Sequence, residues 1–311
     1  MVVAERRRAV IGAVLVFGVA AIVGCSTAVT SGSGGDGASA APDTTQAVET
    51  TEATTTTTEA PTTTLAPTTT EAPTTTAEPT TTLPPTTTLP VNMIPVGIVD
   101  PPLQAVGGNS GGETTRVQNR LLELGFWLQS PDGQYGLTTR QAVMAFQKYM
   151  GFESTGKVDQ RTADGLTSMT LRPVARANSG TLIEVDKGKQ LLYFVIEGRT
   201  DWILNTSTGN GEEYTEEDKN TPGELITGVS LTPSGLHKVN RERPEGWWEG
   251  DLGEIYRPKY FVGGVAVHGS NSIPNYAASH GCVRVSVPAM DWIWEYNLMP
   301  MRVPVWVHDG A

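Results

Sequence analysis

The stretch HGSNSIPNYAASHGCVRV, residues 268–285, decides how the rest of this 311-residue chain is interpreted. It contains Cys282, one of 2 cysteines in the chain, together with His268, His280 and Arg284. A thiol with a pKa of about 8.5 is mostly protonated at neutral pH, so a nucleophilic cysteine needs a base or a positive charge nearby. Both histidines and the arginine are able to meet that need. The stretch therefore predicts a reactive thiol.

The backbone around the cysteine separates the two histidines. His268 ends the apolar run FVGGVAV, a predicted strand and hence a rigid support for an imidazole. His280 stands two residues before Cys282, and residues two apart on an extended backbone share a face. We expect His268 to act as the general base and His280 to orient the thiol or its loop. Gly281 lets the backbone bend, so its N–H and that of Cys282 are candidates for stabilising an oxyanion.

The N-terminus has the pattern of an export signal. Three arginines at 6–8 precede an apolar run over 9–23, which is shorter than the roughly 20 residues of a membrane-spanning helix. The run ends in IVGC, residues 22–25, which resembles the lipobox of bacterial lipoproteins. The resemblance implies a lipoprotein signal peptide over 1–24, lipidation of Cys25 and an anchor in the outer face of the cell membrane. An uncleaved anchor and a signal cut near Ala28 stay open as alternatives.

Export makes the other cysteine unusual. Secreted chains pair their cysteines in an oxidising compartment, but a lipidated Cys25 leaves Cys282 without an intrachain partner. Such a thiol is either a buried small hydrophobe or a reactive group. A zinc site of His268, His280 and Cys282 is a further interpretation, although a structural zinc ion needs four ligands and no fourth is obvious.

Residues 25–112 are predicted to form a disordered Thr/Pro-rich linker. From about 31 to 90 the chain is almost entirely Thr, Pro, Ala, Glu, Gly and Ser, with few apolar side chains to offset the entropy of ordering. At about 3.1 Å per residue, the linker reaches on the order of 200 Å. The net charge of -11 provides no basic face for phosphates, so nucleic acid is not an expected partner.

A small helical domain is predicted over 113–171. The apolar spacing and the capping residues indicate three helices, which begin at Thr114 or Thr115, at Thr138 or Thr139, and after Asp159.

This segment also contains an internal repeat. DGQYGLTTRQAV, residues 132–143, aligns with TGKVDQRTADGL, residues 155–166, and each copy has a glycine turn and a threonine that opens a helix. Together with VQNRLLELGF, the repeat resembles the small three-helix type of peptidoglycan-binding domain. A helical spacer that does not bind peptidoglycan stays open as an alternative.

A mainly β domain is predicted over 181–309, so the chain is a multidomain α+β protein. TLIEVD, LLYFVIEG and DWILNTSTG are short β-branched and aromatic runs separated by turns, which is typical of an antiparallel meander. One helix is expected over 288–296. The acidic run 212–218 and the segment RPEGWWEGDLG are expected to be loops. Four tryptophans are candidates for a peptide groove or for packing: Trp247, Trp248, Trp292 and Trp294.

Essentially the whole of this β domain resembles one enzyme family. HGSNSIPNYAASHGCVRV is similar to the active-site signature of the L,D-transpeptidases of bacterial cell walls, and TPSGLHKV from Thr232 is similar to that family's TP-x-G strand. There are two departures from the pattern. The spacing from His268 to Ser279 is shorter than in the commonest form of the motif, which bears on the lid over the site. His237 stands where an aromatic residue is usual, which bears on strand packing.

The resemblance implies a role for each residue of the motif. Cys282 is the nucleophile, and His268 is the proton donor and acceptor. His280 and Ser279 set the cysteine loop, with Gly281 beside them at the oxyanion position. Arg284 pairs with a carboxylate or a backbone acceptor of the substrate.

The implied reaction is acyl transfer without a metal or an organic cofactor. Cys282 forms a thioester with a stem tetrapeptide, D-alanine leaves, and an amine of a neighbouring stem takes up the acyl group. The expected partners are peptidoglycan stem peptides, the bacterial cell wall and, through the lipid, the membrane. An L,D-carboxypeptidase that uses water as acceptor and a non-catalytic wall-tethering protein stay open as alternatives.

Overall fold

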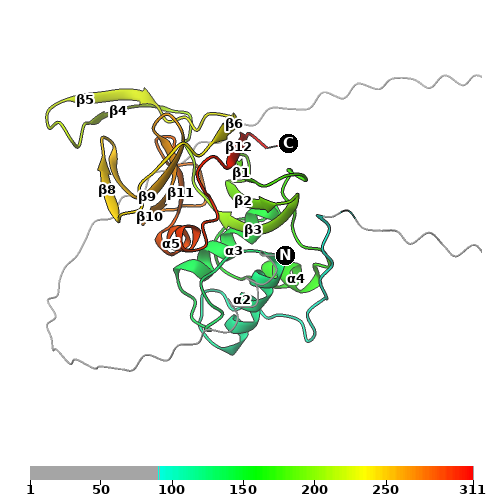
Figure 1. Ribbon diagram of the computed structural model, residues 1–311. Helices are drawn as coiled ribbons and strands as arrows, with labels where there is room; N and C mark the ends of the chain where they lie inside the picture. Colours follow the sequence, from blue (N-terminus) through cyan, green and yellow to red (C-terminus); the bar gives the residue numbers. More distant parts are fainter. Residues whose placement is uncertain (1–89, 91, 311) are drawn as a thin grey trace, which may run out of the picture. The chain divides into compact units, whose positions relative to one another are not determined.

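The computed structural model describes residue 90 and residues 92–310, and Figure 1 shows how their elements are arranged. The predicted signal peptide, Cys25 and most of the predicted linker lie outside the described residues. Among the helices of the described part, none combines the length and the apolar character that crossing a bilayer requires. Three helices followed by a mainly β domain with one helix confirm the predicted fold class.

The helical unit contains α2 (Gly112–Leu124), α3 (Leu137–Tyr149) and α4 (Gln160–Ser168). Two of the predicted caps are wrong, because α2 and α3 begin directly after Gly111 and Gly136, which carry no capping side chain. The third helix begins after Asp159 as predicted, and the Asp159 carboxylate caps it by accepting from the backbone N–H of Thr162 at 2.8 Å.

The threonines of the internal repeat serve as buried hydrogen-bond partners of glutamines. Gln118 of α2 accepts from the backbone N–H of Gly133 and donates to Thr139 Oγ1 at 2.8 Å. Gln147 of α3 repeats the arrangement one unit later, accepting from Gly156 N–H and donating to Thr162 Oγ1 at 3.0 Å. A buried amide that is fully bonded fixes each turn against the preceding helix. The glycines and threonines of the repeat therefore serve to hold the turns in place.

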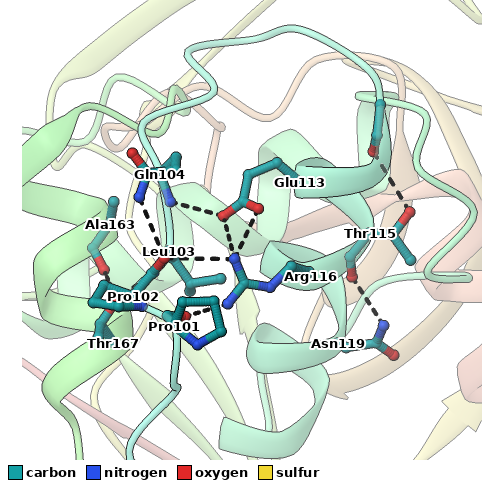
Figure 2. A network of polar contacts seen from close by, with 11 residues as sticks. Pro101, Pro102, Leu103, Gln104, Glu113, Thr115, Arg116, Asn119, Ala163 and Thr167 are labelled. Atoms are coloured by element: carbon teal, nitrogen blue, oxygen red, sulfur yellow. Dashed lines mark hydrogen bonds and ion pairs between the residues drawn. The ribbon is translucent and has the colours of Figure 1, made fainter.

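The segment just before α2 packs against the helical unit. Leu103 is 1% exposed in its core, and its backbone N–H donates to Thr167 Oγ1 at 3.0 Å. Figure 2 shows Arg116 of α2 between the Glu113 carboxylate, 2.9 Å away, and the carbonyl oxygens of Pro101 and Pro102. The predicted end of the linker at Gly112 is therefore too late in the chain.

The β unit contains three sheets. One has the order β3-β2-β1-β12-β6; a second has the order β11-β10-β9-β7, with β8 also paired to β9; the third is the hairpin β4-β5. The strands are β1 (Leu182–Asp186), β2 (Leu191–Ile196), β3 (Arg199–Asn205), β4 (Glu213–Glu217), β5 (Leu225–Val229), β6 (Gly235–Lys238), β7 (Arg241–Glu242), β8 (Trp247–Gly250), β9 (Gly253–Val262), β10 (Val265–Ser270), β11 (Val283–Ser286) and β12 (Pro304–His308).

The predicted meander is confirmed for β1, β2 and β3, which pair antiparallel in chain order. Two pairs, β1 with β12 and β10 with β11, are parallel instead. The acidic run 212–218, predicted as a solvated loop, forms β4, and the Trp-Trp segment, also predicted as a loop, forms β8. Both are outer hairpin strands with at most half-buried side chains, so they lack the apolar alternation that marks a core strand.

The helix α5 (Val287–Glu295) closes the core beneath the second sheet. Ser286 caps it, as its hydroxyl accepts from the backbone N–H of Ala289 at 3.3 Å. Met290 and Ile293 are fully buried with Val267 and Val285 of the sheet. One face of β10 and β11 thus packs against α5. The polar residues of the motif are then expected on the other face.

The helix α3 packs directly on β2 and β3. Val143 and Phe146 of the helix share one buried cluster with Tyr193 and Ile203 of these strands. Residues 92–168 and 181–308 therefore meet through a common apolar core, which positions α3 beside the segment that follows β3.

Candidate active site

The register of two parallel strands determines which motif residues share a face. His268 of β10 lies directly opposite Arg284 of β11, and Val267 lies opposite Val283. Since side chains alternate along a strand, the valines point into the core and His268 and Arg284 point away from it. Cys282 directly precedes β11, two residues before Arg284, so its side chain continues the polar row. The structure thus places Arg284 close to both His268 and Cys282.

The imidazole of His268 is almost fully buried, with 3% of the residue exposed. Its Nδ1 lies 2.8 Å from the backbone carbonyl oxygen of Gly269. A carbonyl only accepts, so Nδ1 carries the proton and the lone pair is on Nε2. Burial lowers the pKa of His268 to about 4. The charge of Arg284 also lowers it, whereas the hydrogen bond to Gly269 raises it. The ring is therefore a neutral base at neutral pH.

The thiol of Cys282 is unpaired and half-buried. Its Sγ lies 3.8 Å from the carbonyl oxygen of Gly264, in the turn between β9 and β10. Burial raises the pKa of the Cys282 thiol, whereas a hydrogen bond with the backbone of Ala266 and the charge of Arg284 oppose the rise. The resting sulfur is therefore a protonated thiol and needs a base during attack.

A buried serine fixes the conformation of the cysteine loop. Ser279 Oγ donates to the carbonyl oxygen of Cys282 at 2.5 Å and accepts from the N–H of Gly281 at 3.1 Å. The expected role of Ser279 in setting the loop has a geometric basis in these bonds. The Gly281 N–H, expected to face an oxyanion, is instead used inside the loop.

Gly281 is required by the backbone rather than by an oxyanion. Its φ is 134°, a conformation that favours glycine, and a Cβ would lie 2.6 Å from the carbonyl oxygen of Leu231. The close neighbour belongs to the segment that contains Thr232, whose hydroxyl donates to the Gly281 carbonyl at 2.6 Å. Thr232 Oγ1 also accepts from the N–H of Gly209 at 2.9 Å. The TP-x-G segment is thus the second support of the cysteine loop.

The third support is the segment Thr206–Thr208, whose members are all fully buried. The Thr208 carbonyl accepts from the N–H groups of Ala278 and Ser279, and Thr206 Oγ1 donates to the Arg284 carbonyl at 2.8 Å. Sequence reasoning missed this segment. The sequence feature that could have revealed it is a run of three small hydroxyl residues directly after a buried strand. Such residues are usually expected in a solvent-exposed turn.

Arg284 is the cation of the site. Its backbone bonds to Ser207 on the side away from β10, and its guanidinium is half-buried. Burial lowers the pKa of Arg284, and the proximity of Cys282 opposes the shift. Within residues 92–310, no carboxylate forms an ion pair with it. This charge is therefore available to a ligand.

His280 contacts the strand β4. Its Nε2 lies 2.9 Å from Glu216 Oε1, and its ring packs edge-on against Tyr214, with centroids 4.9 Å apart. Both partners belong to β4. Of the two roles expected for His280, to orient the thiol or to set its loop, these contacts are consistent with the second. They connect the cysteine loop to the β4-β5 hairpin.

The β4-β5 hairpin is held at its far end as well. The backbone N–H of Lys219 donates to the Asp251 carbonyl at 2.9 Å, and the Asn220 amide donates to the Asp251 carboxylate at 2.7 Å. Asp251 lies in the turn between β8 and β9. The tips of the two hairpins are thereby joined.

The four tryptophans divide into two pairs. Trp292 of α5 packs among aromatic rings, 5.0 Å from Trp127 and 5.5 Å from Trp202, and Trp294 donates to the Arg257 carbonyl at 2.8 Å. This pair therefore serves packing. Trp247 and Trp248 of β8 are 42% and 43% exposed and remain candidates for contact with a ligand.

His237, the second departure from the family pattern, is a packing residue. It packs at 5.8 Å on the ring of Phe261 and bonds through Nε2 to the Pro233 carbonyl at 3.0 Å.

Two family models match the chain. The model of a peptidoglycan binding domain matches residues 110–166, and the model of an L,D-transpeptidase catalytic domain matches residues 180–307. No curated protein is similar enough to the chain to match.

Solved structures give a more extensive match. An L,D-transpeptidase from Xylanimonas cellulosilytica is 42% identical, with 68% of this chain and 100% of that chain covered and a TM-score of 0.60. L,D-transpeptidases from Stackebrandtia nassauensis and Mycobacterium smegmatis are each 19% identical, with TM-scores of 0.36 and 0.31. These two matches cover 68% and 41% of this chain and 98% and 58% of the respective relatives.

Proposed function

Because this chain belongs to the L,D-transpeptidase family, we propose that Cys282 and His268 transfer an acyl group between stem peptides of peptidoglycan. The observation that carries the proposal is the shared face of β10 and β11. It presents a thiol, a neutral imidazole with its lone pair on Nε2, and the guanidinium of Arg284.

In the first step the sulfur attacks the carbonyl carbon between the L-centre of a diamino acid and a terminal D-alanine. His268 Nε2 takes the thiol proton as the C–S bond forms, and the same proton passes to the amine of D-alanine as the C–N bond breaks. A thioester on Cys282 remains. The neutral ring supports this assignment, since a general base contributes about 10²- to 10⁴-fold to the rate only when its lone pair is free.

The oxyanion of this step is assigned to the N–H of Cys282 itself. The neighbouring N–H of Gly281 is engaged by Ser279 Oγ, so it is a poor donor for a developing charge. A donor of this kind is worth about 10²- to 10³-fold in rate. Rigid support of the loop by Ser279 and Thr232 favours a fixed donor direction.

In the second step an amine of a neighbouring stem attacks the thioester. His268 Nε2 takes a proton from the amine, the C–S bond breaks, and the sulfur leaves as a thiolate that regains the proton. Water in place of the amine gives a shortened stem, which is the L,D-carboxypeptidase alternative.

The test is acylation of the full chain by a tetrapeptide stem, followed by intact mass measurement. The wild-type chain is expected to gain the acyl mass and to release D-alanine, and Cys282→Ala is expected to gain none. A crosslinked dimer among the products identifies transfer, and a tripeptide identifies hydrolysis. An unmodified wild-type chain would contradict the proposal.

The enzyme acts on peptidoglycan, outside the cytoplasm, because it combines a peptidoglycan binding domain with the catalytic domain. We further propose that lipid on Cys25 holds it at the membrane, on the evidence of the IVGC sequence alone. The Cys25→Ala variant should then be absent from the membrane fraction of expressing cells. Its retention there would contradict lipidation.

A further inference from the structure

A hollow of about 500 Å³ lies between the end of α3 and the turn that joins β1 and β2. It is lined from three parts of the chain: Lys148–Gly151 of the helical unit, Gly188–Gln190 of the turn, and Asn275 of the motif stretch. Ligand sites of a few hundred Å³ are of the size that holds a short peptide segment.

Two lysines face this hollow. Lys148 is buried, with 9% of the residue exposed, and its Nζ donates to the carbonyl oxygens of Gln190 and Thr206, each at 3.2 Å. Lys189 is exposed on the opposite wall, with its Nζ 5.0 Å from the centroid of the Tyr149 ring. The two ammonium groups thus line one hollow of a chain whose net charge is -11.

Neither ammonium group is neutralised. In the described part of the chain, no carboxylate forms an ion pair with Lys148 or Lys189, and the buried carboxylate of Asp186 accepts from the backbone N–H of Lys189 instead. Burial lowers the pKa of Lys148 to about 7. The Lys148 amine is therefore only partly charged at neutral pH, and an anion bound beside it would favour its charged form.

The hollow is connected to the catalytic residues through Thr206. The carbonyl of Thr206 accepts from Lys148, and its hydroxyl donates to the carbonyl of Arg284. On the other side, the Asn275 amide donates to the Ser154 carbonyl at 3.0 Å, which fixes it between the motif and the helical unit. Lys148, which lines the hollow, is therefore linked through Thr206 to the strand that carries Arg284.

We propose that this hollow is a subsite for a carboxylate of a peptidoglycan stem peptide, bound by Lys148 and Lys189 while the stem extends toward Cys282. The proposal rests on the proposed function for the identity of the ligand. A peptide fits better than a phosphate polymer, because the carboxamide side chain of Asn275 lines the hollow beside the lysines and is able to bond to a peptide backbone.

The test measures binding of a soluble tetrapeptide stem to the full chain carrying Cys282→Ala, which prevents turnover. The probe is used in two forms, with free carboxylates and with carboxamides in their place. The carboxylate form is expected to bind about tenfold more tightly, and Lys189→Ala is expected to remove that difference. Lys157→Ala, an exposed lysine of the same helical unit outside the hollow, serves as the matched control and should change nothing.

Lys148→Gln tests the buried cation and should also abolish the preference. If that variant fails to fold, Lys189→Ala still decides the matter. Equal affinity for the two probes, or a preference that survives Lys189→Ala, overturns the subsite. Inorganic phosphate that competes as well as the carboxylate stem overturns the assignment to a stem.

Thioester formation by the wild-type chain separates this proposal from the proposed function. A normal thioester together with an unaffected Lys189→Ala variant means that the subsite is wrong and the reaction is right. If the chain prefers the carboxylate probe but forms no thioester, the subsite is right and the proposed reaction is wrong.

Discussion

His268 and Arg284 lie directly opposite each other on the parallel strands β10 and β11. The guanidinium charge lowers the pKa of the imidazole and also that of the Cys282 thiol. The charge stabilises the thiolate and disfavours the imidazolium, so it favours loss of the thiol proton while it keeps the resting ring neutral. Burial favours the neutral form of each group, which keeps the resting pair as thiol and imidazole rather than as an ion pair.

Arg284→Met should raise the pKa of Cys282, since the thiolate loses its neighbouring cation. The pH dependence of alkylation by iodoacetamide measures this pKa directly. Arg284→Lys keeps the charge and is the control, with a pKa close to that of the wild type. An alkylation profile that does not respond to Arg284→Met would show that the guanidinium acts on the substrate alone.

His268→Gln should reduce acylation by about 10²- to 10⁴-fold while Cys282 still reacts with iodoacetamide. In the wild type, the pKa of about 4 keeps the ring neutral at higher pH, so the acylation rate should fall only as the pH drops through about 4. A rate that falls near pH 6.5 would contradict a buried neutral base.

The same shift makes a prediction for stability. The folded-state pKa of about 4 is below the ordinary value of 6.5, so between these two pH values the unfolded chain binds a proton that the folded chain does not. The contribution of His268 to the free energy of unfolding therefore rises with pH across this window. Chemical denaturation at several pH values measures this contribution. The free energy of unfolding should rise more steeply between pH 4 and 6.5 in the wild type than in His268→Gln.

His280→Ala should leave the pKa of Cys282 unchanged, because the ring bonds to Glu216 and packs on Tyr214. The pair is partly exposed, so its loss should cost no more than about 1 kcal/mol of stability. Glu216→Gln removes the charge of the same contact and is the matched variant. If the alkylation profile shifts in His280→Ala but not in Glu216→Gln, His280 interacts with the thiol after all.

The sequence predicted the residues of the site better than their contacts. Cys282 and Arg284 were singled out because they stand two residues apart, at strand spacing, and His268 because it ends an apolar run. The face of His280 was not predictable, since Gly281 has a φ of 134° and breaks the alternation on which the expectation relied.

The parts of the fold that escaped prediction share one cause. The hairpin strands β4 and β8 are outer strands: β4 carries charge where a core strand carries apolar groups, and the two tryptophans of β8 are adjacent and exposed rather than alternating. The buried segment Thr206–Thr208 is polar because its partners are backbone groups of the motif, more than 60 residues away in sequence. Single-sequence patterns report local periodicity and do not contain such distant partners.

The contact between α3 and the motif predicts that the helical unit helps to position the active site, and this is testable at one residue. Gln141 of α3 donates to the Ile273 carbonyl at 3.2 Å and accepts from the Asn205 amide at 2.6 Å. Ile273 belongs to the motif stretch, and Asn205 precedes the segment that supports Arg284. Gln141→Ala leaves both groups without this partner, which costs about 1–3 kcal/mol for each buried group.

Gln147→Ala is the matched control, because Gln147 is a buried glutamine of the same helix whose bonds all stay within the helical unit. Both variants should lower the melting temperature. On fully folded protein, only Gln141→Ala should also lower the rate constant of acylation, since only it releases the motif and the segment beside Arg284. If both variants acylate at the wild-type rate below their melting temperatures, the helical unit has no part in positioning the active site.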